Sequence, residues 1–302
     1  MRQIIKYVTD YFLSIPLRVF ITCTFFIAVA IFCNYYFGLN ARINALPDVL
    51  QFLSWFLIFC IAFFVGYFVQ VWHTKNRLFQ NPIFLFLLVA APAIFAWKMM
   101  ADFNFNFSGN ADQNSYWNHV VYWPLKLLVV VLVLYFIWKQ FHPEQPFYGT
   151  ATQNFDVKPY LLMLLLMLPL LLWASTQHDF LAVYPKLKNV PFLAADGTWY
   201  QKLLYELSYG TDFFTIELFF RGFLVLAFAK WAGKEAVLPM ALFYCTIHFG
   251  KPLGECISSY FGGMILGAVI LQTRSIWGGL IVHLGIAWLM ELFGYLGHTL
   301  WK

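Results

Sequence analysis

The chain has 302 residues, of which 62% are hydrophobic and only 11% are charged, whereas an ordinary soluble domain has about 25% charged residues. Its 19 basic and 14 acidic residues are too few to cover the surface of a soluble protein of this length, which excludes that class. The net charge of +5 does not indicate a nucleic-acid partner, because Lys and Arg lie mostly at the ends of apolar segments. The lipid bilayer is therefore the expected surrounding of most of the chain.

Residues 1–18 predict a short helix that lies on the membrane surface before the first span. Apolar residues recur there at helical spacing, with charged residues between them. The apolar residues are Ile4, Ile5, Val8, Phe12 and Ile15, and the charged ones are Arg2, Lys6 and Asp10.

Nine later stretches are apolar enough to cross a hydrocarbon core of about 30 Å as helices, and eight spans would also agree with the sequence. Lipid offers no partners to backbone N–H and C=O groups, so the spans must be helical and the fold class is all-α. The expected spans are Val19–Phe37, Leu50–Trp72, Pro82–Trp97, Val120–Trp138, Pro159–Ser175, Tyr209–Lys230, Ala236–Phe249, Ile257–Gln272 and Ile276–Tyr295.

The basic residues between these spans favour a cytoplasmic N-terminus in a multi-pass integral membrane protein, since Lys and Arg are more frequent in cytoplasmic loops. With that orientation the inner side collects Arg2, Lys6, Arg18, Lys75, Arg77, Lys139, Lys158, Lys230, Lys234 and Arg274. The outer side receives fewer: Arg42, Lys98, Lys186, Lys188, Lys202, Lys251 and Lys302.

Polar residues divide the chain further. Two segments, 101–118 and 140–158, are rich in Asn, Gln, Pro and Gly, which predicts surface connections. Polar residues inside the spans are sparse before residue 205 and concentrated after it. We therefore expect membrane helices and loops over 19–208 and a functional core over 209–302, with the active cavity among its four helices.

Glu217 and Arg221 stand well inside the sixth expected span. Charges at this depth cost several kcal/mol, so they suggest a functional site by default. Their spacing places them on one helical face in the favourable order, acid before base. An ion pair that only holds this helix to its neighbours is an equally open interpretation.

Two histidines follow in later spans. His248 comes four residues after Tyr244, and His283 lies inside the ninth expected span. A lone buried histidine is more often a satisfied core residue, but the ordered set from Glu217 to His283 resembles the CPBP family of intramembrane peptidases, which includes the CAAX prenyl endopeptidases. The family's motifs are EExxxR, FxxxH and HxxxN or HxxxD, each on its own membrane helix. The similarity covers about residues 209–290 and includes Gly263 and Gly267, whose spacing lets two membrane helices approach closely.

The resemblance implies an endopeptidase that cleaves a peptide or lipidated protein with an activated water. Glu217 would be the general base, His248 would orient the water and His283 would donate to the oxyanion. Arg221 would hold Glu217, and Tyr244 would support the site. No cofactor is implied. The HExxH zinc pattern is absent, and the five cysteines show no paired spacing, so we expect no metal and no disulfide framework.

Two positions depart from the family motifs. Ile216 stands where the first Glu of EExxxR belongs, and Ala287 stands where the Asn of HxxxN belongs. Asp212 and Trp288 are possible substitutes, although each points in a different direction or lies at a different height along its helix. A catalytically inactive relative that acts as a membrane binding, immunity or scaffold protein is therefore the alternative. A transporter is a third possibility, because intramembrane charges also mark ion pathways.

Overall fold

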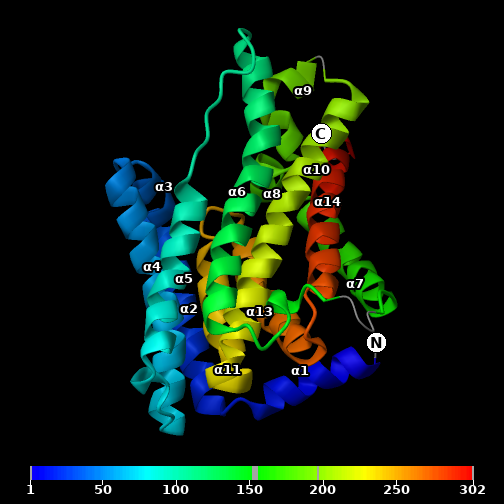
Figure 1. The fold of residues 1–302 in the computed structure, drawn as a ribbon. Helices are drawn as coiled ribbons and strands as arrows, with labels where there is room; N and C mark the ends of the chain where they lie inside the picture. Colours follow the sequence, from blue (N-terminus) through cyan, green and yellow to red (C-terminus); the bar gives the residue numbers. More distant parts are fainter. Residues whose placement is uncertain (1, 152–155, 196, 301–302) are drawn as a thin grey trace. The chain divides into compact units, whose positions relative to one another are not determined.

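A computed structural model describes residues 2–151, 156–195 and 197–300. Helices make up most of these residues, residues 101–110 form an irregular connection between α5 and α6, and no strand occurs among the described residues (Figure 1). The all-α fold expected from the sequence is confirmed.

The chain forms two compact units, and each is described by itself. The first unit comprises residues 1–100, 136–153 and 218–276, and the second comprises residues 101–135, 154–217 and 277–302. These limits follow contacts rather than function, so the predicted division into 1–18, 19–208 and 209–302 stays a prediction.

The centre of the first unit is α12, a short helix whose residues are all buried. It packs against α13, α4 and α2. A Cβ on Gly66 of α4 would lie only 2.6 Å from Cα of Pro239 in α12, so the two backbones touch. The helices of this unit are α1 (Arg2–Ser14), α2 (Leu17–Phe37), α3 (Leu39–Asn44), α4 (Asp48–Thr74), α5 (Pro82–Met100), α11 (Ala229–Ala232), α12 (Val237–Thr246) and α13 (Leu253–Thr273), with turns η1 (Leu78–Gln80), η2 (Phe147–Gly149) and η5 (Gly233–Ala236).

The second unit is built around α14, which packs against α7, α8 and α10. Small residues permit this approach: a Cβ on Gly285 of α14 would lie 2.6 Å from the Leu164 side chain of α7. The elements are α6 (Ala111–Phe141, of which 111–135 belong here), α7 (Lys158–Ala174), α8 (His178–Val183), η3 (Lys186–Asn189), α9 (Pro191–Ala195), α10 (Trp199–Ile216) and α14 (Trp277–Leu300).

Six helices of the described residues are long and apolar enough to cross a membrane: α2, α4, α5, α6, α13 and α14. Three other expected spans correspond to α7, which is 17 residues long, to the α10 region, and to α12, which is 10 residues long. The protein is thus a polytopic membrane protein, while the count of eight or nine spans stays a prediction.

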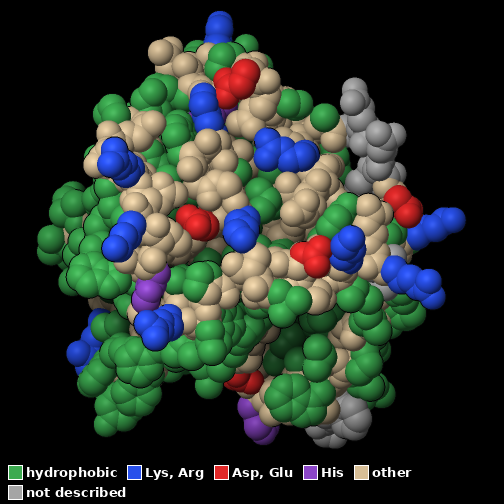
Figure 2. All heavy atoms as spheres, turned by 90° about the horizontal axis from the view of Figure 1, so that it is seen from below, with side chains coloured by type: hydrophobic (Ala, Val, Ile, Leu, Met, Phe, Trp, Pro, Cys, Tyr) green, Lys and Arg blue, Asp and Glu red, His purple; other side chains and the backbone are tan. Residues whose placement is uncertain are grey.

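The expected N-terminal helix is present as α1, which lies crosswise to α2, α4 and α5 (Figure 1). Ile4 and Tyr11 are buried, and the Lys234 ammonium donates to the carbonyl of Ser14, where α1 ends. Basic side chains are spread over the face seen from this side (Figure 2). A position on the membrane surface suits this helix, and it stays a prediction.

The segment after α6 corrects the sequence interpretation. Residues 140–158 were expected to form a surface connection, but His142 and Tyr148 are fully buried. The His142 Nδ1 lies 3.1 Å from the Tyr148 hydroxyl, and a Cβ on Gly222 would meet the Tyr148 carbonyl oxygen at 2.6 Å. Positive φ angles at Tyr148 and Gly149 turn the chain inward there. Residues 143, 144, 146 and 156–158 are exposed, and 152–155 lie outside the described residues. The expected surface connection is therefore wrong at residues 142, 148 and 149.

Candidate functional site

The helix that carries Glu217 changes its geometry at that residue. α10 ends at Ile216, and the chain continues without a break into η4 (Glu217–Ala227), whose turns are of the π type. Glu217 keeps helical backbone angles, with φ −67° and ψ −42°. π turns are rare and often occur at functional sites. The change of helix type therefore marks Glu217 independently of its charge.

In the second unit Glu217 contacts His283. The His283 Nδ1 lies 2.9 Å from the Glu217 Oε1. The Glu217 side chain is fully buried, whereas the imidazole is 17% exposed. The ring of Phe213, one turn earlier on α10, packs edge-on against the imidazole at 4.8 Å between centroids. The pair is thus enclosed on the glutamate side and reachable on the histidine side.

This contact limits what each group can do. A carboxylate only accepts hydrogen bonds, so with Glu217 ionised the His283 Nδ1 carries the proton and donates it. In the neutral imidazole the Nε2 is then an acceptor that can take a proton. A buried carboxylate also stabilises the imidazolium that forms when Nε2 is protonated. The arrangement is that of a carboxylate that orients a histidine base.

In the first unit Arg221, Tyr244 and His248 form a second group. The Arg221 guanidinium lies 4.1 Å from the centre of the Tyr244 ring, a distance at which a cation and an aromatic face attract. The Tyr244 and His248 rings are 4.7 Å apart. The His248 Nδ1 lies 2.9 Å from the Tyr244 carbonyl oxygen. A carbonyl can only accept, so Nδ1 is the donor and the neutral His248 also presents Nε2 as an acceptor.

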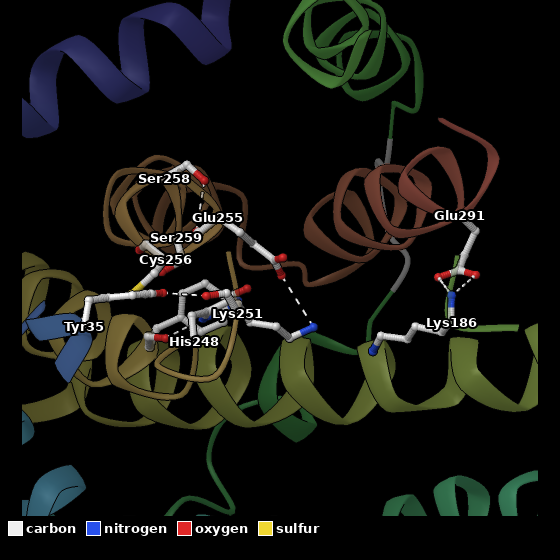
Figure 3. Close-up of polar contacts among 10 residues, drawn as sticks. Tyr35, Lys186, His248, Lys251, Glu255, Cys256, Ser258, Ser259 and Glu291 are labelled. Atoms are coloured by element: carbon white, nitrogen blue, oxygen red, sulfur yellow. Dashed lines mark hydrogen bonds and ion pairs between the residues drawn. The ribbon is translucent and has the colours of Figure 1, made fainter. Parts of the chain in front are cut away.

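Two residues of α2, Asn34 and Tyr35, hold the turn after His248. The Asn34 amide of α2 donates to the Phe249 carbonyl at 2.8 Å, and the Tyr35 hydroxyl donates to the Lys251 carbonyl at 2.6 Å. Lys251 and Glu255 form an ion pair at 3.6 Å across the start of α13 (Figure 3). Asn34 was detectable as a polar residue inside the first expected span.

The second unit also contains two acidic residues with buried carboxylates, Glu291 and Glu206. Both oxygens of the Glu291 carboxylate accept from the Lys186 backbone N–H, at 3.0 and 2.8 Å (Figure 3). Glu206, outside the expected spans, has two carboxylate oxygens that are buried without a hydrogen-bond partner. Burial and the charge of Glu291 raise the pKa of Glu206 to about 7. Burial of Glu206 was not evident from the sequence, because the residue precedes the apolar run.

The two departures from the family motifs lie on these same helices. Ile216 and Ala287 are both buried, and neither side chain can donate or accept a hydrogen bond. Trp288 is 40% exposed, which does not favour its indole as a donor in a dry site. Asp212 lies on α10, one turn before Ile216. A substitute for either missing group stays a hypothesis.

The residues expected from the sequence thus fall into two sets. Glu217 and His283 meet in the second unit, and Arg221, Tyr244 and His248 meet in the first. Residues 205–289 match the family model described as type II CAAX prenyl endopeptidase Rce1-like. This part of the chain is Rce1-like.

The match confirms the resemblance to the CAAX-protease-like family. The Rce1-like segment covers less than a third of the chain and contains all five residues of the two sets. Searches of curated proteins and of solved structures returned no match. The match to a membrane protease family model, together with the six apolar helices, supports a multi-pass integral membrane protein.

Proposed function

We propose that this protein is an intramembrane endopeptidase that hydrolyses a peptide bond of a peptide or lipidated protein substrate. One observation carries the proposal: within the Rce1-like segment, a fully buried carboxylate and a partly exposed imidazole are hydrogen-bonded at 2.9 Å. General acid–base catalysis needs a base within hydrogen-bond reach of the proton that it removes.

The exposure of the two side chains indicates which of them contacts the attacking water. Water cannot contact the Glu217 carboxylate, which has no exposed surface, but it can reach the imidazole of His283. His283 Nε2 would take a proton from the attacking water and later return it to the leaving amine. Glu217 would orient the ring and stabilise the imidazolium. This assignment differs from the one that the family resemblance implied, in which Glu217 is the general base and His283 donates to the oxyanion.

The resemblance also assigns His248 to the reaction. Its Nε2 is an acceptor when Nδ1 donates to the Tyr244 carbonyl, which suits a group that accepts a hydrogen bond from the water. Arg221 is always charged, and its contact with Tyr244 fixes its direction. We propose Arg221 and Tyr244 as positioning residues.

The alternative function is a catalytically inactive relative that binds a peptide or lipid as an immunity or scaffold protein. Ile216 and Ala287 favour it, because neither offers the carboxylate or the amide of the family motifs. Both functions need the same helices, so only a measurement of product distinguishes them.

The test is cleavage by the full chain in proteoliposomes, with libraries of prenylated and unprenylated peptides and detection of products by mass spectrometry. The wild type is expected to release fragments, and Glu217→Gln is expected to lose this activity. Asp48→Asn, which removes an exposed carboxylate at the start of α4, is the matched control. Equal product from wild type and Glu217→Gln would exclude the proposed mechanism, and no product from either would support the inactive alternative.

A further inference from the structure

Two cysteines on neighbouring helices of the first unit lie in contact. Cys245 belongs to α12 and Cys256 to α13, and both are buried. Their sulfur atoms are 4.0 Å apart. The Cys245 Sγ also lies 3.3 Å from the Cys256 carbonyl oxygen, and the Cys256 Sγ lies 3.8 Å from the Cys245 carbonyl oxygen. Each side chain thus reaches the backbone of the other residue.

The close approach of α12 and α13 extends beyond the cysteines. A Cβ on Gly263 would lie 3.2 Å from the Tyr244 ring, and one on Gly267 would lie 2.8 Å from the Met240 side chain. Small residues at this spacing allow membrane helices to pack with their backbones close together. The two thiols are therefore held at short range by the packing of the helices on which they stand.

We propose that Cys245 and Cys256 form a reversible disulfide when the protein meets a hydroperoxide. A disulfide needs the sulfurs at about 2.05 Å, so from 4.0 Å the two sulfurs have to approach each other by about 2 Å. The sequence spacing gave no sign of this pair, because the two residues face each other only after the chain turns between α12 and α13.

The reaction has two steps that balance. One thiol sulfur attacks the hydroperoxide, the O–O bond breaks, and an alcohol leaves with the thiol proton while a sulfenic acid forms. The second thiol then attacks the sulfenic sulfur. An S–S bond forms, and the released hydroxide leaves as water with the second proton. Two thiols are oxidised, and one hydroperoxide is reduced to an alcohol.

An apolar groove of about 610 Å³ lies between α2 and α13, next to the pair. Neither cysteine lines it and both are fully buried, so the oxidant has to pass the side chains of the groove wall. Leu253, Ile257 and Tyr260 line it, on either side of Cys256 along α13, and Tyr35 lines it from α2. The Cys256 sulfur points toward Tyr35 (Figure 3). Because α2 and α13 are both candidate membrane spans, an apolar hydroperoxide dissolved in lipid fits this groove better than a charged oxidant.

The bridge would close a segment that contains His248, three residues after Cys245. Oxidation would then restrict the movement of that imidazole. A change in peptidase activity on oxidation rests on the proposed function, but formation of the bridge does not. The experiment therefore measures the thiols themselves.

The experiment uses the full chain in proteoliposomes, treated with cumene hydroperoxide and then denatured and alkylated. We expect the peptides of Cys245 and Cys256 to appear as one cross-linked species, lighter by two hydrogen atoms than the two free peptides together and separated by a reducing agent. Cys245→Ser is expected to lose this species. Cys33 and Cys60 are only half-buried, so they show that the oxidant has reached the protein.

Two results would overturn the proposal. In the first, Cys33 and Cys60 are oxidised while Cys245 and Cys256 are both recovered as alkylated thiols. In the second, Cys245 or Cys256 is found bridged to another cysteine as often as to its partner. The Cys256→Ser variant checks the assignment from the other side, since it must lose the same cross-linked species.

Discussion

His283 and Glu217 are 66 positions apart in the sequence, and their side chains meet at 2.9 Å, with the imidazole Nδ1 facing the carboxylate Oε1. The contact joins the last described helix, α14, to the residue at which α10 passes into a π turn. A buried carboxylate beside a histidine fixes the tautomer of the ring.

Replacement of His283 by alanine is expected to lower kcat by about 10²- to 10⁴-fold, the usual contribution of a general base. KM is expected to change little, because the lost interaction acts mainly in the transition state. Steady-state kinetics on the best peptide from the substrate screen measures both. A rise in KM with an unchanged kcat would assign His283 to substrate binding instead.

Glu206 makes the stability of the second unit depend on pH. Its pKa is raised from 4.5 to about 7 by burial and by Glu291, so the folded state holds this proton more tightly than the unfolded state does. Folding stability is therefore lost as pH rises from about 4.5 to about 7. Glu206→Gln should remove that loss.

Thermal unfolding of wild type and Glu206→Gln in detergent, at about pH 5 and about pH 8, tests this sign. The variant is expected to gain Tm relative to wild type at the higher pH and to gain much less at the lower pH. The same Tm difference at both pH values would show that the Glu206 carboxyl is solvated.

His142 has the opposite effect from Glu206 on the pH dependence of folding stability. Burial, and next the charge of Lys230, lower the pKa of this histidine from 6.5 to about 4. The unfolded chain binds the proton first, so stability is lost as pH falls from about 6.5 to about 4. His142→Asn should be less stable than wild type near neutral pH, by about 1–3 kcal/mol, because the Tyr148 hydroxyl loses its partner.

The free energy of unfolding of His142→Asn, measured at several pH values, separates the loss of the hydrogen bond to Tyr148 from the change in pH dependence. The variant is expected to lose less stability than wild type between about pH 6.5 and about pH 4. An unchanged pH slope would mean that His142 takes up its proton without unfolding of the loop that buries it.

The substitution Gly66→Ala tests the contact between α4 and α12. Alanine there places a Cβ 2.6 Å from Cα of Pro239, so one backbone must shift, and we expect a loss of about 1–3 kcal/mol. Gly262→Ala in α13 is the matched control, because its Cβ meets nothing within 4 Å and alanine favours the helix. Equal unfolding temperatures for the two variants would contradict the described packing.

The orientation of the chain also has a direct test. We propose a cytoplasmic N-terminus, because Arg2, Lys6 and Arg18 lie at or before the first span and Lys75 follows the second. To find the side on which the N-terminus lies, a cysteine is added before Met1. It is then labelled with a membrane-impermeant maleimide in vesicles of each orientation. Labelling in vesicles that expose the cytoplasmic face is expected, and labelling only in the opposite vesicles would reverse the topology.

The helices were predicted best where apolar length alone decides. α2, α4, α5 and α14 begin and end within a few residues of the expected spans, except for the longer end of α14. α12 is shorter than expected, because helical bonding stops at Thr246 and His248 lies in the turn that follows. The π geometry at Glu217 has no simple signature in composition.

The site was predicted only in part. Residue order and the family motifs selected Glu217 and His283, but spacing along the chain could not show that the two make a direct hydrogen bond. That contact depends on how α10 and α14 pack. The burial of His142 and the pairing of Cys245 with Cys256 were missed for the same reason, since both depend on how the chain turns.

The most direct test of the central claim is chemical rescue of His283→Ala by imidazole, with the full chain in proteoliposomes. His283→Ala is expected to cleave the peptide substrate of the wild type about 10²- to 10⁴-fold more slowly, and added imidazole is expected to restore part of the lost rate by supplying the missing base. The Glu217→Gln variant, which keeps His283, is expected to gain nothing from imidazole. Cleavage by His283→Ala at the wild-type rate without imidazole would contradict the account.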